Sequence, residues 1–136
     1  MNIRFPKLLI TDDDRSLRDT LSGLFQARGF DVVLAADGHQ AVELATSQEP
    51  HLALMDLHLP GINGLDAVRR VWRDHLEQPD RSLPCIMISA LWDEATLSQA
   101  QSLSVYSTLS KPISVREITD TVNQAMRHFY DWPGNN

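Results

Sequence analysis

Cysteine is almost absent from this 136-residue chain, which contains only Cys85. A chain with one thiol has no internal disulfide, so the fold depends on its core. Cys85 stands in the apolar run PCIMISA, which predicts a buried thiol in a reducing compartment. The five histidines are scattered, without His-x-x-x-His or Cys-x-x-Cys pairs, so the usual spacing of a zinc site is missing.

Positive charge and long apolar runs are also scarce. The net charge of −6 argues against binding of a nucleic-acid phosphate backbone by this domain. No stretch approaches the roughly 20 apolar residues of a membrane span. The first ten residues, MNIRFPKLLI, do not have the pattern of a secretory signal. We therefore expect a single cytoplasmic domain that contacts neither membrane nor nucleic acid.

Five short apolar runs are distributed along the chain and predict β-strands. The third and fourth are almost continuously apolar, as expected for central strands that are covered on both faces. The fifth, VYSTL, is more polar than the others. The runs are residues 7–10, 32–35, 52–55, 85–89 and 105–109.

The segments between these runs carry apolar residues at helical spacing. The first has Leu17, Leu21 and Phe25 on one face, and Gly29 stands where that helix should end. The other helices are expected to begin after a capping residue, namely Asp37, Asn63, Asp93 and Ser114. The longest loop is expected at residues 77–84. This alternation predicts an α/β fold, with helices on both faces of a parallel sheet and right-handed crossovers.

Polar side chains follow four of the predicted strands. They are Asp12, Asp13 and Asp14 after the first, Asp56 after the third, Ser89 at the end of the fourth and Lys111 after the fifth. Ligands of an open parallel sheet bind beyond the carboxyl ends of its strands, so these side chains should meet at one edge. Clustered carboxylates suit a hard divalent cation such as Mg²⁺. Lys111 and Ser89 would supply an ammonium and a hydroxyl donor to an incoming phosphoryl group.

Four motifs in series make the chain resemble the receiver domain of two-component response regulators, such as the chemotaxis regulators. They are LLITDDD, LMDLHLPGINGL, IMISA and LSKPIS, and they extend the resemblance over about residues 7–128. The resemblance implies a flavodoxin-like (βα)5 three-layer sandwich whose five parallel strands have the order 2-1-3-4-5. It also implies a receiver domain at residues 1–130, followed by a short tail at 131–136.

The resemblance assigns phosphoryl chemistry to three residues. Asp56 matches the phosphoacceptor, whose carboxylate takes a phosphoryl group from a sensor histidine kinase or a phosphotransfer protein. Lys111 matches the cation that neutralises the transferring oxygens, and Ser89 matches the hydroxyl that bonds the attached group. The chain would thus be a signalling switch with autophosphorylation and autodephosphorylation activity rather than an enzyme acting on other substrates.

The resemblance also implies a Mg²⁺ site. Asp13 would bind the ion directly and Asp12 mainly through water, while Asp56 and the backbone carbonyl of His58 would complete the set of protein ligands. Asp14, the third carboxylate of the first motif, is expected to cap the following helix instead.

One position departs from the family pattern. Many receivers have an aromatic residue three positions before the lysine, and that ring rotates when the hydroxyl residue moves. Here the position is Thr108, and Tyr106 lies two residues earlier on the same face of an extended strand. The coupling is therefore expected to be a smaller rearrangement, or one that involves Leu91 and Trp92.

Further expectations concern surfaces. The resemblance implies a cis peptide bond between Lys111 and Pro112. It also implies that partner binding or homodimerisation uses the fourth helix, fifth strand and fifth helix, roughly residues 93–103, 105–109 and 114–128. The aromatic end of the chain, HFYDWPGNN, is expected either to fold back on the domain or to serve as a linker or partner contact.

Two other functions fit parts of the pattern. An aspartate-nucleophile phosphohydrolase of the haloacid dehalogenase type also uses a parallel sheet and Mg²⁺, and Asp12–Asp14 form a D-x-D. A late G-D-x-x-x-D motif and residues for a substrate cap are missing. A receiver-like scaffold without phosphorylation would accommodate the changes at Thr108 and at Ser104 and Val105, which replace the small Gly-Ala pair common in the family. Whether the chain is a stand-alone receiver or a fragment of a larger regulator stays open.

Overall fold

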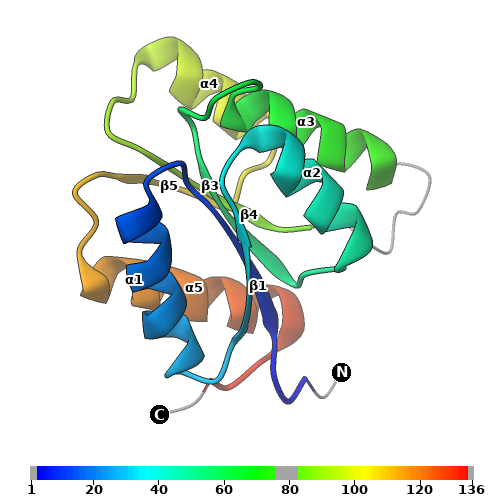
Figure 1. Cartoon of the computed structure of the whole chain (residues 1–136), viewed down its shortest axis with the longest axis vertical. Helices are drawn as coiled ribbons and strands as arrows, with labels where there is room; N and C mark the ends of the chain where they lie inside the picture. Colours follow the sequence, from blue (N-terminus) through cyan, green and yellow to red (C-terminus); the bar gives the residue numbers. More distant parts are fainter. Residues whose placement is uncertain (1–2, 76–82, 135–136) are drawn as a thin grey trace.

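A computed structural model describes residues 3–75 and 83–134, in which five strands and five helices alternate (Figure 1). The strands are β1 (Lys7–Thr11), β2 (Asp31–Ala35), β3 (Leu52–Asp56), β4 (Cys85–Ser89) and β5 (Ser107–Ser110). The helices are α1 (Arg15–Gln26), α2 (Gly38–Ser47), α3 (Gly64–His75), α4 (Glu94–Ser102) and α5 (Val115–Tyr130). Most of the loop expected at residues 77–84 lies outside the described residues.

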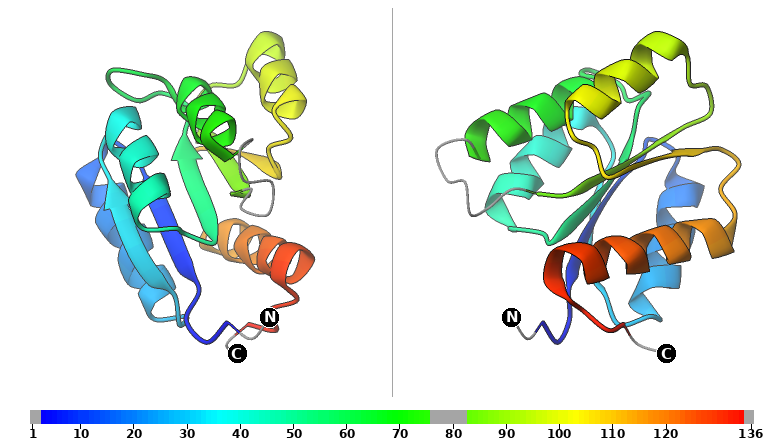
Figure 2. Two further views of the ribbon diagram at one scale, coloured as in Figure 1. Left: turned by 90° about the vertical axis from the view of Figure 1, so that its right-hand side faces the viewer. Right: turned by 180° about the vertical axis from the view of Figure 1, so that it is seen from behind.

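The strands form one sheet in the order β2-β1-β3-β4-β5, and each neighbouring pair is parallel. Helices α1 and α5 cover one face, and α2, α3 and α4 cover the other, as Figures 1 and 2 show. The predicted three-layer sandwich and strand order are confirmed. All strands run in one direction, so their carboxyl ends share one edge of the sheet.

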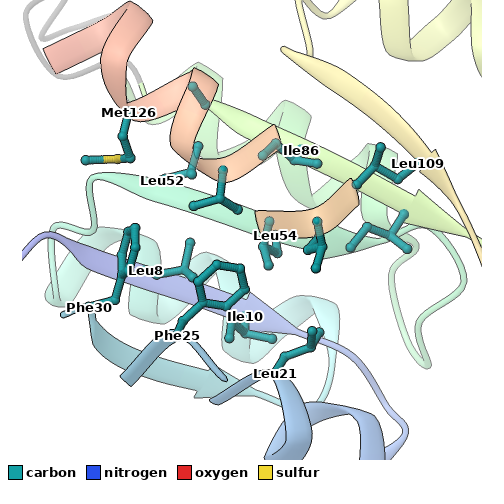
Figure 3. Close-up of a cluster of buried hydrophobic side chains, with 14 of the residues drawn as sticks. Leu8, Ile10, Leu21, Phe25, Phe30, Leu52, Leu54, Ile86, Leu109 and Met126 are labelled. Carbon is teal, nitrogen blue, oxygen red and sulfur yellow. The ribbon is translucent and has the colours of Figure 1, made fainter. Parts of the chain in front are cut away.

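Side chains of each strand alternate between two cores. In β1, Leu8 and Ile10 pack with residues of α1 and α5, whereas Leu9 packs on the opposite face with residues of α2 and α3. Figure 3 shows the first cluster, in which Phe25 of α1 lies among the strand residues. Both β3 and β4 are buried along their whole length, as their continuous apolar runs predicted.

The helix starts follow the predicted capping residues. The side chains of Asp37, Asn63, Asp93 and Ser114 each accept a hydrogen bond from the backbone N–H three residues further on. Gly29 has a φ of +93° and follows α1, which agrees with its expected role at the end of that helix. The four predicted helix starts are therefore confirmed.

The fifth strand begins later than its apolar residues suggested. It spans Ser107–Ser110 rather than residues 105–109. The chain turns at Ser104, whose φ is +58°, and only then joins the sheet. Val105 belongs to this connection and packs against the core on the α4 side. Val105 is apolar because it fills the core, and it does not belong to the strand that pairs with β4.

Residues 130–132 fold back on the domain, which agrees with one of the two expectations for the aromatic tail. Trp132 is only 6% exposed, and its ring packs edge-on against Phe30 with centroids 5.1 Å apart. The hydroxyl of Tyr130 donates a 2.6 Å hydrogen bond to the carbonyl of His51. Within the described part of the chain, every helix is too short or too polar to span a bilayer.

Candidate functional site

Two buried aspartates stand where neighbouring strands end. Asp56 is the last residue of β3 and is 4% exposed, and Asp12 directly follows β1 and is 3% exposed. The strands pair side by side, with Thr11 opposite Met55, which places the two carboxylates at the same sheet edge. Burial of two like charges is costly unless a cation neutralises them.

Lys111 provides that cation. Its Nζ donates hydrogen bonds to Oδ2 of Asp12 at 2.8 Å and to Oδ2 of Asp56 at 2.9 Å. The lysine follows β5, and its backbone N–H donates to the carbonyl of Ser89 at 2.9 Å, which anchors it beside β4. The peptide bond between Lys111 and Pro112 is cis, as expected.

Burial and hydrogen bonding have opposite effects on the pKa values of Asp56 and Lys111. Burial raises the pKa of Asp56, and the Asp12 carboxylate adds to the rise, while hydrogen bonds from Lys111 and the His58 N–H oppose it. Burial acts to lower the pKa of Lys111, but its hydrogen bonds to the two carboxylates outweigh burial and raise that pKa. The protonated lysine is therefore favoured at this position.

A third carboxylate completes a cluster that could hold a metal ion. Asp12, Asp13 and Asp56 each offer an oxygen, and these oxygens lie within 4.8 Å of one another. Asp13 is exposed, whereas the other two are buried, so the cluster is open to solvent on one side. An all-carboxylate donor set suits a hard cation such as Mg²⁺ and does not favour zinc. The residues present therefore fit the expected ion.

The backbone around the cluster is fixed by local hydrogen bonds. The N–H of His58 donates to Oδ1 of Asp56 at 3.1 Å, which places the backbone of His58 beside this carboxylate. The N–H of Asp14 donates to Oδ1 of Asp12 at 2.9 Å. The Asp14 carboxylate itself accepts from the N–H groups of Ser16 and Leu17, so the predicted helix cap is confirmed.

Ser89 lies at the same edge but bonds elsewhere. It follows Ile88, which pairs with Asp56, and it is fully buried. Its Oγ donates to the carbonyl of Leu91 at 2.9 Å and accepts from the N–H of Leu91 at 3.1 Å. The structure thus brings Asp12, Asp13, Asp56 and Lys111 together, with the Ser89 hydroxyl engaged by its own loop.

Two further residues support the backbone of the site. Arg18 of α1 donates from Nη1 to the backbone carbonyl of Asp12 at 2.7 Å. Gly64 begins α3 so close to the carbonyl of Asp56 that an added Cβ would collide with that oxygen. The glycine of the GINGL motif was visible in the sequence, whereas nothing marked Arg18 among the basic residues of its helix.

Comparison with known proteins identifies the family from the sequence and finds the same fold in solved structures. The sequence matches the response regulator receiver domain family over residues 8–123. The receiver domain protein (CheY-like) of Methanospirillum hungatei JF-1 is similar, with a TM-score of 0.83, 19% identity, and 91% of this chain and 95% of that chain covered. Chemotaxis protein CheY4 of Vibrio cholerae gives a TM-score of 0.79 at 22% identity, with 89% and 98% covered. A chain of the CheX–CheY–BeF3–Mg²⁺ complex from Borrelia burgdorferi gives 0.79 at 22% identity, with 89% of both chains covered.

Proposed function

Because this chain belongs to the response regulator receiver domain family, we propose that Asp56 accepts a phosphoryl group and that its phosphorylation switches the domain between two conformations. The donor would be a sensor histidine kinase or a phosphotransfer protein. The observation that carries the proposal is the convergence of Lys111 with the buried carboxylates of Asp12 and Asp56 at one sheet edge.

The transfer is a displacement at phosphorus. An oxygen of Asp56 forms a bond to phosphorus while the bond from phosphorus to the imidazole nitrogen of the donor breaks, and that nitrogen keeps the electron pair. Lys111 already bonds Oδ2 of Asp56, so its ammonium stands where negative charge on the phosphoryl oxygens would arrive. The hydrogen bond from the His58 N–H to Oδ1 holds the carboxylate in a fixed orientation.

Asp12, Asp13 and Asp56 would hold Mg²⁺, together with the backbone carbonyl of His58. When bound, the ion supplies positive charge that stabilises the oxygens of the transferring group. Asp12 is then shared between the ion and Lys111, which bonds its Oδ2. The structures related to this chain include the CheX–CheY–BeF3–Mg²⁺ complex, which supports the same assignment here.

Intact-mass measurement tests the proposal. The wild-type chain, incubated with Mg²⁺ and acetyl phosphate, should gain the mass of one phosphoryl group. Asp56→Asn should gain none, whereas Asp14→Asn, which alters only the helix cap beside the site, should be labelled like the wild type. Labelling of Asp56→Asn at the wild-type rate would overturn the assignment of the acceptor.

Two further assays, phosphate release and partner binding, separate the alternatives. A phosphohydrolase would release phosphate from ordinary monoesters over many turnovers and lose this activity in Asp12→Asn. A scaffold that does not use phosphorylation would take no label and would bind its partner equally with and without beryllofluoride. A stable mass gain of one phosphoryl group per chain favours the proposed signalling switch.

We assign partner binding or homodimerisation to the face formed by α4, β5 and α5. Val115 and Phe129 of α5 expose 57% and 44% of their surface, which leaves apolar area available to a partner. Phosphorylation would then change the affinity of this face. Light-scattering mass with and without beryllofluoride tests the dimer, and an unchanged monomer would contradict it.

A further inference from the structure

The one hydrogen of the Ser89 hydroxyl is already donated within its own loop. Its Oγ donates to the carbonyl of Leu91 and accepts from the N–H of the same residue. A serine hydroxyl has a single hydrogen to donate. If Ser89 donates to a phosphoryl group on Asp56, it must release the carbonyl of Leu91.

The next residue in this loop reaches across to another strand. Trp92 donates from its indole Nε1 to the backbone carbonyl of Leu109 at 2.8 Å. Leu109 belongs to β5, which is the edge strand of the sheet and pairs only with β4 among the described residues. A side chain from the loop after β4 therefore supplies a hydrogen bond to the outermost strand.

The indole also packs on the sheet face that carries Thr108. Trp92 is half-buried against the cluster on the α4 side of the sheet, which includes Met87. Thr108 pairs with Met87, so the two side chains share that face. Thr108 is small, and the aromatic ring on this face comes from the loop rather than from the strand.

We propose that Trp92 is the residue that couples the phosphorylation site to β5 in this chain. The inference rests on the proposed function of Asp56. In the resting state, the two hydrogen bonds between Ser89 and Leu91 hold the loop, and the loop holds the indole on the carbonyl of Leu109. When Ser89 turns to a phosphoryl group, Leu91 is released and the bond between Trp92 and Leu109 breaks.

The coupling has a defined direction. Breaking the indole bond frees a carbonyl on β5 and unpacks a ring beside α4, both of which lie in the face assigned above to partners. A phosphoryl group can shift this equilibrium only because Ser89 bonds it in one arrangement and not in the other. The new bond of Ser89 to the phosphoryl group therefore provides the free energy that breaks the bond between Trp92 and Leu109.

Indole N–H resonances test the proposal in the full chain. The chain has three tryptophans, at positions 72, 92 and 132, and the peak of Trp92 is the one lost in Trp92→Phe. Mg²⁺ with beryllofluoride serves as the phosphoryl mimic, and the backbone amide of His58 reports its binding, since that N–H bonds Asp56. Trp132, which packs on Phe30 beyond the opposite end of the strands, is the internal control.

Binding should shift the His58 amide and move the Trp92 indole peak toward the position of an indole without a hydrogen bond, while the Trp132 peak stays in place. A shifted His58 amide with an unmoved Trp92 peak would overturn the coupling and leave the proposed function intact. An unmoved His58 amide would refute both.

Variants at Ser89 test the route. Ser89→Ala loses one hydrogen bond to the mimic, so it is compared at a beryllofluoride concentration that saturates the shift of the His58 amide; its Trp92 peak should then no longer respond. Ser89→Thr keeps a hydroxyl and should restore the response. A Trp92 peak that moves equally in Ser89→Ala would show that the indole does not respond through Ser89, and it would contradict the proposal.

Discussion

The ammonium of Lys111 lies 2.9 Å from Oδ2 of Asp56, although the two residues are 55 positions apart in the sequence. The same ammonium also donates a hydrogen bond to Asp12, so it lies between two buried carboxylates at one edge of the sheet. Each carboxylate is tolerated in the core because the lysine reaches it. Stability and the proposed function therefore depend on the same atoms.

Removal of the Lys111 ammonium should destabilise the fold. Lys111→Met leaves two buried carboxylates facing each other, and we expect the free energy of unfolding without Mg²⁺ to fall by about 1–3 kcal/mol. Mg²⁺ should recover part of this loss, with a larger rise in melting temperature than in the wild type. Arg116→Met is the matched control, because Arg116 is exposed and its Nε lies as far as 4.0 Å from Oδ2 of Asp120. Such a solvent-exposed pair contributes little, so its free energy of unfolding should change by about 0.5 kcal/mol or less. Equal losses in the two variants would contradict the buried pairing.

Removal of the Asp13 carboxylate and removal of the adjacent Asp14 carboxylate should have different effects on stabilisation by Mg²⁺. Asp13→Ala removes a proposed ligand, so addition of Mg²⁺ should no longer raise the melting temperature. Asp14→Ala removes the cap of α1 and should cost about 0.5–2 kcal/mol in free energy of unfolding, while the Mg²⁺ response persists. Thermal unfolding with and without Mg²⁺ separates the two. A retained Mg²⁺ response in Asp13→Ala would exclude that carboxylate as a necessary ligand.

Gly64 should tolerate no side chain. A Cβ at this position would overlap the carbonyl oxygen of Asp56 and crowd the end of Met87, so Gly64→Ala should lower the free energy of unfolding by about 1–3 kcal/mol. Gly23 in α1 is the control, because a Cβ there would meet no atom within 4 Å. Gly23→Ala should be stabilising by about 0.5–1 kcal/mol, since it removes a helix-interior glycine. Denaturant unfolding measures both, and a neutral Gly64→Ala would contradict the close approach.

His51 should make stability sensitive to acid. Its Nδ1 accepts a 2.9 Å hydrogen bond from the N–H of Lys7. Burial, and then the charge of Lys7, lower the pKa of His51 below its ordinary value of 6.5. The folded state therefore favours the neutral ring, and its contribution is present above pH 6.5 and is lost as the pH falls toward the lowered pKa.

The histidine titration can be observed directly. The imidazole proton resonances of His51 should shift with a midpoint below 6.5. The stability difference between the wild type and His51→Gln should shrink as the pH falls through this range. A midpoint above 6.5, or a stability difference independent of pH, would show that His51 does not act as a half-buried hydrogen-bond acceptor in the folded state.

Much of the site could be predicted from the sequence because parallel strands all end at one edge. Topology explains why the site residues meet. Asp56 ends β3, and Asp12, Asp13 and Lys111 come shortly after the ends of β1 and β5. Helix starts were equally accessible, since a capping side chain bonds a backbone N–H only three residues away.

Other features depend on contacts that no short pattern encodes. The polar strand STLS at the sheet edge has no apolar alternation, and its start was therefore placed too early. The hydrogen bonds of Ser89 to Leu91 and of Trp92 to Leu109 depend on how one loop packs against its neighbours. Burial of Trp132 similarly depends on Phe30, about a hundred residues earlier.

The central claim, that Asp56 is the phosphoacceptor of a Mg²⁺-dependent site, is tested most directly by locating the phosphoryl group. After incubation with acetyl phosphate, borohydride reduction of the acyl phosphate followed by peptide mass spectrometry should find the modification at Asp56, with Mg²⁺ and not with EDTA. Modification of another residue, or equal labelling of Asp56 when the metal is removed, would contradict the account.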